Sequence, residues 1–163
     1  SNSIGRMDRK GGWISAQRLA DISSEYKRLN PFGVFKVNTV VNQFNHHESL
    51  VDVMTIVSPD KWKLLRVLPV YDHIKPVSDG EFEGYTERHS MFSHINVVED
   101  NSDMAASYMM INPNGCFYQN TEFKKGYEIS EPILQVGIAK AFEQIDFDTD
   151  TFFSRYNTEV SHV

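Results

Sequence analysis

The sequence predicts an α/β protein in which helices cover a parallel sheet and an α+β extension follows. Three observations support this prediction. Between residues 14 and 89, helical and strand patterns alternate with short connections, which is typical of a parallel sheet. After about Val98 the pattern changes to a hairpin and a helix. The chain has 163 residues, 40% of them hydrophobic, which is enough to bury a sizeable core.

The first helix is predicted at residues 14–29. Apolar side chains recur there three and four residues apart, at Leu19, Ile22, Tyr26 and Leu29. Asn30-Pro31 ends the pattern, because the residue before a proline disfavours helix.

The first strand is predicted at residues 34–42, where side chains alternate between two faces. Lys36 and Asn38 share a face. Burying a lysine and an amide in a Val/Phe-rich strand is costly unless an anionic or polar group meets them. This points to a binding site. The alternative is an edge strand with one solvated face.

The second strand is predicted at residues 62–70. Lys61 immediately precedes it, and Lys63 is its second residue. Consecutive parallel strands usually lie side by side, so these lysines could converge with Lys36 and Asn38. Three ammonium groups on one surface need an anion, and a polyphosphate fits best. The alternative places Lys61 and Lys63 at a solvated strand start.

Two further helices are predicted around these strands. Asn45 and Glu48 have the spacing of a capping box. An apolar stripe follows at Leu50, Val53, Met54 and Val57. Ser78 and Glu81 repeat the capping spacing before a helix that contains Phe82, Tyr85 and His89.

The extension is predicted to start with a hairpin of strands 107–111 and 116–120, joined by an Asn-Pro-Asn-Gly turn. A loop is predicted at 124–130 and a helix at 136–145. Asp148 is predicted to cap a last short helical turn.

Composition excludes several functions. Sixteen basic and 22 acidic residues give a net charge of −6, which argues against nucleic acid or an anionic membrane as partner. There is no apolar run of membrane-spanning length and no hydrophobic signal region in the sequence, so we expect a cytoplasmic protein. The histidines lack metal-ligand spacing, and no metal site is predicted. The sequence opens without Met on a loop, which suggests a fragment.

Six motifs, in the same order, resemble the C-terminal half of the viperin-like radical S-adenosylmethionine (SAM) enzymes. They are IGR at 4–6, FKVNTVVNQFN at 35–45, Pro-x-x-Trp-Lys at 59–63, Glu-Arg-His at 87–89, Ser-Tyr at 107–108 and ILxVG at 133–137. The resemblance covers essentially the whole chain.

The resemblance implies a partial (β/α)6 barrel. Residues 1–98 would form its C-terminal part, and residues 99–163 an extension that closes the nucleotide site. The family converts a nucleoside triphosphate (CTP, UTP or GTP) to its 3′-deoxy-3′,4′-didehydro analogue, an antiviral chain terminator. By resemblance, Gly5 and Arg6 would contact SAM, and Tyr108 would donate a hydrogen atom or electron to the substrate.

The resemblance also implies that four residues hold the triphosphate, namely Lys36, Asn38, Lys61 and Lys63. This agrees with the anion site inferred from the alternation. Lys61 stands where animal viperins have arginine, so the charge is kept but the bidentate fork is lost.

One departure is important: Cys116 is the single cysteine. The family holds a 4Fe-4S cluster through three thiolates of a CxxxCxxC loop, so those ligands are not in this chain. We therefore expect the chain alone to be inactive and to need the N-terminal half of the barrel as partner. The alternative is a non-catalytic nucleotide-binding or partner-binding α/β module.

Overall fold

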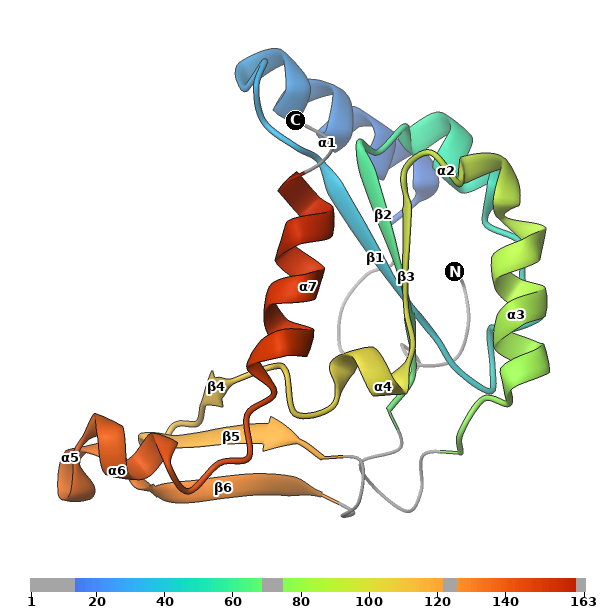
Figure 1. Cartoon of the computed structure of the whole chain (residues 1–163). Coiled ribbons are helices and arrows are strands. Elements are labelled where there is room, and N and C mark those ends of the chain that lie inside the picture. Colours follow the sequence, from blue (N-terminus) through green and yellow to red (C-terminus); the bar gives the residue numbers. More distant parts are fainter. Residues whose placement is uncertain (1–13, 69–74, 122–125, 161–163) are drawn as a thin grey trace. The chain divides into compact units, whose positions relative to one another are not determined.

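The computed structural model describes residues 14–68, 75–121 and 126–160. The chain divides into two compact units. The first comprises residues up to 67 together with 75–99, and the second comprises 68–74 together with 100–163. The fold is mixed α/β, with a parallel sheet in the first unit and an antiparallel sheet in the second (Figure 1). The boundary at residue 98 and the closing of a site by the second part remain predictions.

The first unit alternates helices and strands, as predicted. Its elements are α1 (Ala16–Leu29), β1 (Lys36–Val41), α2 (Val51–Val57), β2 (Lys61–Arg66), α3 (Asp79–Arg88), the 3-10 turn η1 (Ser90–Phe92) and β3 (Asn96–Glu99). The strands lie in the order β1-β2-β3, and both neighbouring pairs are parallel. The predicted parallel sheet is confirmed. The third strand was not predicted.

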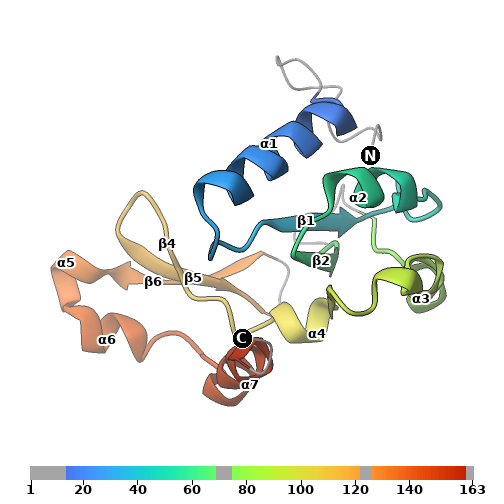
Figure 2. The same ribbon diagram turned by 90° about the horizontal axis from the view of Figure 1, so that it is seen from above.

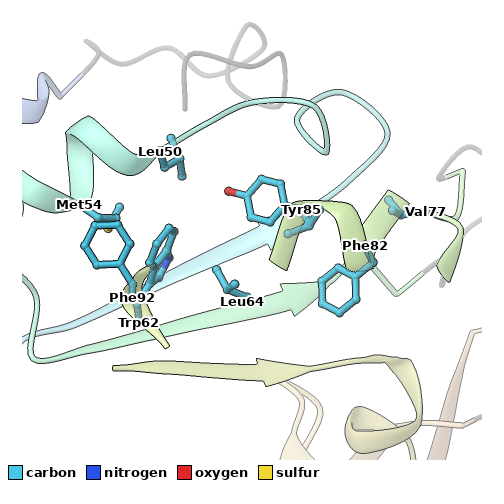
Figure 3. Close-up of a cluster of buried hydrophobic side chains, with 9 residues drawn as sticks. Leu50, Met54, Trp62, Leu64, Val77, Phe82, Tyr85 and Phe92 are labelled. Atoms are coloured by element: carbon cyan, nitrogen blue, oxygen red, sulfur yellow. The ribbon is translucent and has the colours of Figure 1, made fainter. Parts of the chain in front are cut away.

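The core of the first unit lies between one face of the sheet and the helices α2 and α3 (Figure 3). Val41, Trp62 and Leu64 are fully buried on this face. They pack in one cluster with Met54 of α2, Phe82 and Tyr85 of α3, and Leu50, which immediately precedes α2. Trp62 donates its indole N–H to the Thr39 hydroxyl at 2.9 Å, so its polar atom is satisfied inside the core. Helix α1 packs beside α2 (Figure 2).

The helix starts follow the predicted capping in one case and depart from it in another. Before α3, Ser78 and Glu81 form a full capping box, as predicted. Asn45 does not cap α2, which begins at Val51 without a side-chain cap. The Asn45 amide instead donates to the Val40 carbonyl at 2.9 Å and accepts the Asn42 N–H at 2.7 Å. The prediction was wrong because Asn45 satisfies the backbone at the end of β1.

The second unit combines a small antiparallel sheet with helices. Its elements are α4 (Asn101–Met104), β4 (Met110–Ile111), β5 (Cys116–Asn120), β6 (Tyr127–Pro132), α5 (Ile133–Val136), α6 (Ile138–Phe142) and α7 (Thr149–Val160). The sheet order is β4-β5-β6, and both pairs are antiparallel. The predicted hairpin is confirmed, although its first strand is only two residues long.

Three predictions for the second unit need correction. The segment predicted as a loop up to residue 130 contains most of β6, because its backbone pairs with β5. The predicted helix 136–145 is broken at Gly137, whose φ of 85° is not helical. Tyr108 precedes β4 instead of lying in it. Asp148 does cap the last helix by accepting the Thr151 N–H at 2.9 Å, but α7 runs on to Val160.

Within the described ranges, none of these helices combines the length and apolar character needed to cross a membrane.

Candidate functional site

The register of the parallel sheet brings the four predicted phosphate-binding residues together. Lys36 lies opposite Lys61, and Asn38 lies opposite Lys63. Residues paired in this way on neighbouring parallel strands point to the same face of the sheet. All four therefore share the face opposite the core. We call this face, with its Lys36, Asn38, Lys61 and Lys63, the polar face.

Exposure falls across the polar face. Lys36 and Asn38 on β1 are exposed, Lys61 at the start of β2 is half-buried, and Lys63 in the middle of β2 is buried at 8% exposure. A lysine is almost never this buried unless its charge is paired. The structure thus separates the lysines into an accessible one on the outer strand and a buried one on the central strand.

The buried lysine pairs with a residue that the sequence reasoning missed. The Lys63 ammonium forms an ion pair with the Glu99 carboxylate, and their side chains are 10% and 4% exposed. Glu99 is the last residue of β3, two positions beyond the residue opposite Lys63. The sequence offers little signal for it: Val97 and Glu99 would share one face of a strand, but only the register of the sheet puts that face on the side of Lys63.

The other predicted residues fall elsewhere. Gly5 and Arg6 lie outside the described residues. Tyr108 belongs to the second unit and is half-buried there. The adjacent Ser107 is fully buried and donates its hydroxyl to the Asp103 carbonyl at 2.8 Å. The structure therefore shows the burial of Tyr108 and of its neighbour, while the role of Tyr108 stays a prediction.

His89 supports the opposite face of the sheet. It is fully buried, its Nε2 accepts the Leu50 N–H at 2.9 Å, and its Nδ1 lies 2.8 Å from the Tyr85 carbonyl, to which it donates. Burial foremost, and then the charge of Arg88, lower its pKa, although the hydrogen bond to Tyr85 opposes this. His89 thus joins the start of α2 to the end of α3 as a neutral imidazole.

A groove of about 930 Å³ runs between α1, α2 and the outer edge of β1. Phe35 and Val41 direct their carbonyls to the β2 side. The backbone groups of Lys36 and Asn38, which alternate with them, point to the outer edge. Among the described residues, β1 pairs with β2 alone.

The described residues do not fit an iron–sulfur cluster. No group of three histidine, cysteine or acidic side chains within these ranges could hold a metal ion. Cys116, the single cysteine of the sequence, is buried in β5. A cluster needs several thiolates, so one cysteine cannot supply it.

The fold and the polar face define an α/β protein with a cationic sheet face. No protein-family model matches the chain. It is 47% identical over 158 residues to an S-adenosylmethionine-dependent nucleotide dehydratase from Pseudoalteromonas ulvae, a match that covers 97% of this chain and 51% of the relative. An enzyme of the same name from Psychrobacter lutiphocae is 41% identical over 154 residues, 94% of this chain and 51% of the relative.

The similarity extends to vertebrates. An S-adenosylmethionine-dependent nucleotide dehydratase RSAD2 from Oncorhynchus mykiss is 29% identical over 167 residues, 95% of this chain and 46% of the relative. The resemblance to viperin-like enzymes inferred from the motifs is confirmed by these relatives. The chain spans about half the length of the curated relatives it matches.

Proposed function

We propose that this chain is the part of a viperin-like SAM-dependent nucleotide dehydratase that holds the triphosphate of the substrate. The observation that carries the proposal is the register that puts Lys36 opposite Lys61 and Asn38 opposite Lys63 on one sheet face. The names of the relatives give the substrate class, a nucleotide. The phosphate groups of a nucleotide are anions, and a surface with three lysines favours anions.

The polar face suits phosphate oxygens. Ammonium groups donate charge-assisted hydrogen bonds to phosphate, which are about twice as strong as neutral ones. Asn38 adds an amide N–H donor on the same face. Lys61 acts as a point charge, whereas an arginine would bind phosphate through a planar fork. We therefore propose that the four side chains fix the phosphates while the nucleoside lies elsewhere in the site.

For the whole protein, we propose the dehydration of CTP, UTP or GTP to its 3′-deoxy-3′,4′-didehydro analogue, an antiviral chain terminator. SAM would be the cofactor, contacted by Gly5 and Arg6, and a 4Fe-4S cluster would supply the electron that its cleavage needs. Since Cys116 is the single cysteine, the cluster would be held by residues from outside this sequence.

We also propose that β1 pairs with a parallel strand from the half of the relatives that this chain does not match. Two features support this. Among the described strands β1 lies at the end of the sheet order, and the groove beside it is lined by apolar side chains of α1 and α2, including Leu19, Val53 and Met54. Together the halves would form the partial (β/α)6 barrel, with the polar face turned to its interior.

Tyr108 is our proposed hydrogen donor. A phenol can release a proton and an electron together, which its neighbour Met109 cannot do. Tyr108 is half-buried, so its side chain is partly shielded from solvent and partly exposed. The competing possibility is a packing tyrosine with a satisfied hydroxyl.

The proposed function is tested on the full-length protein, reconstituted anaerobically with iron and sulfide and incubated with SAM and each nucleoside triphosphate. We expect 5′-deoxyadenosine together with a nucleotide product lighter by one water. Tyr108→Phe should keep SAM cleavage but lose most of the product. Triphosphate binding without SAM cleavage in the native protein would favour the non-catalytic module, an alternative supported by the single cysteine.

A further inference from the structure

The polar face contains one acidic residue in an otherwise cationic arrangement. Within the described strands β1, β2 and β3, Glu99 is the single carboxylate. It lies against Lys63, the most buried lysine of the face, and its own side chain is 4% exposed. A site built only to attract phosphate would gain nothing electrostatically from this carboxylate. Its presence therefore needs a reason.

Stability alone is a weak reason. Removing two charges from water costs about as much free energy as their attraction contributes, so buried ion pairs often add little to stability. Removing one partner, however, leaves a buried charge uncompensated. The pair therefore fixes where the ammonium of Lys63 sits. Lys36, on the exposed strand β1, does not share this burial.

We propose that Glu99 is a positioning residue that holds the Lys63 ammonium on the polar face in the orientation that meets the nucleotide phosphates. This inference rests on the proposed function. An ammonium group has three N–H donors, and the hydrogen bond to Glu99 uses one of them. Preorganisation of this kind reduces the ordering cost of binding, and it acts on the phosphates, not on the nucleoside.

The test is a double-mutant cycle in the full-length protein, with Glu99→Gln, Lys63→Ala and the double variant. Calorimetry measures the affinity for a nucleoside triphosphate and for the matching nucleoside. We expect Glu99→Gln to weaken triphosphate binding about fivefold and to leave nucleoside binding unchanged, since an amide replaces the carboxylate of a charged hydrogen bond. With Lys63→Ala already present, Glu99→Gln should have no further effect.

Two further variants make the result specific. Glu99→Asp keeps the charge on a shorter side chain and should bind triphosphate more tightly than Glu99→Gln. Glu83→Gln changes an exposed acid on α3 and should behave as wild type. Melting temperatures of all variants show whether each is folded at the assay temperature, and Glu99→Asp replaces Glu99→Gln in the cycle if the latter is not.

Three results would overturn the inference. Equal losses for triphosphate and nucleoside would make the role of Glu99 purely structural. Additive effects of the Glu99 and Lys63 substitutions would show that Glu99 does not act through Lys63. Tighter triphosphate binding in Glu99→Gln would mean that the carboxylate competes with phosphate. If wild type binds no triphosphate, the proposed function itself fails, which is a distinguishable outcome.

Discussion

The two faces of the parallel sheet are built from the same three strands but carry opposite chemistry. On the face toward α2 and α3, Val41, Trp62 and Leu64 have no exposure at all. On the polar face, Lys36 and Asn38 are exposed and Lys63 is buried only with a partner carboxylate. Alternation along each strand is the cause, since neighbouring residues point to opposite faces. One face forms the core of the first unit, and the other carries the polar side chains to which we assign binding.

The comparison predicts where substitutions affect folding and where they affect binding. Apolar burial stabilises roughly in proportion to the area removed from water, so the core face should dominate the free energy of unfolding. Substitutions of the exposed residues of the polar face should change ligand affinity more than stability. The following predictions sharpen this contrast, from the largest expected effect to the smallest.

The largest stability effect is expected from Leu64→Ala. Leu64 is fully buried in the core of the first unit, and deleting such a side chain typically costs about 2–5 kcal/mol. Val40→Ala is the matched control, because Val40 lies on the polar face of the neighbouring strand and is 47% exposed. Guanidinium unfolding of both variants measures the difference. Equal losses would mean that the two faces contribute alike.

An intermediate effect is expected from pH, through His89. Its pKa is lowered in the folded state, so the unfolded chain binds the extra proton more readily. Its contribution to stability is therefore complete above the unfolded pKa of about 6.5 and is lost as the pH falls toward the folded value. His89→Gln, which does not titrate, should flatten this part of the profile.

Denaturant unfolding between pH 7.5 and pH 5 measures the slope. The control is His94→Gln, which changes an exposed histidine and should leave the profile unchanged. A His89→Gln profile as steep as that of wild type would assign the pH dependence to other groups and would contradict a neutral His89 between α2 and α3.

The smallest effect is expected from Asp60→Asn. Asp60 forms an ion pair with Lys27 at 2.8 Å, and both side chains are about one-third exposed, 38% and 34%. It also accepts the Phe35 N–H at 2.7 Å. Solvent screens such a pair, so we expect a loss of about 0.5–1 kcal/mol in unfolding free energy. A loss as large as that of Leu64→Ala would contradict the dominance of the buried face.

The parallel sheet and its polar face were predicted from local patterns, combined with the general rule that consecutive parallel strands lie side by side. Alternation assigned Lys36 and Asn38 to one face, and parallel pairing brought them opposite Lys61 and Lys63. Glu99 was missed because β3 is only four residues long and gives little periodicity. Its partner Lys63 is 36 residues away, and no local spacing reports such a contact.

Other misses have a similar origin. Asn45 has capping spacing, but the structure uses its amide at the end of β1, because an open strand end competes for the same polar group. The first part of strand β6 was predicted as a loop, and its pairing with β5 decides the outcome. Tertiary context overrides local propensity in both cases.

The central claim is that the polar face binds the phosphates of a nucleotide, and one calorimetric comparison tests it most directly. The full-length protein with Lys36→Ala is titrated with a nucleoside triphosphate and with the matching nucleoside, and Lys140→Ala, at an exposed lysine on α6, is the control. A lost charge-assisted hydrogen bond typically costs about 1.5–3 kcal/mol, so triphosphate affinity should fall roughly tenfold or more. Nucleoside affinity and the control should not change. Unchanged triphosphate affinity in Lys36→Ala would contradict the claim and leave the polar face as a solvated surface.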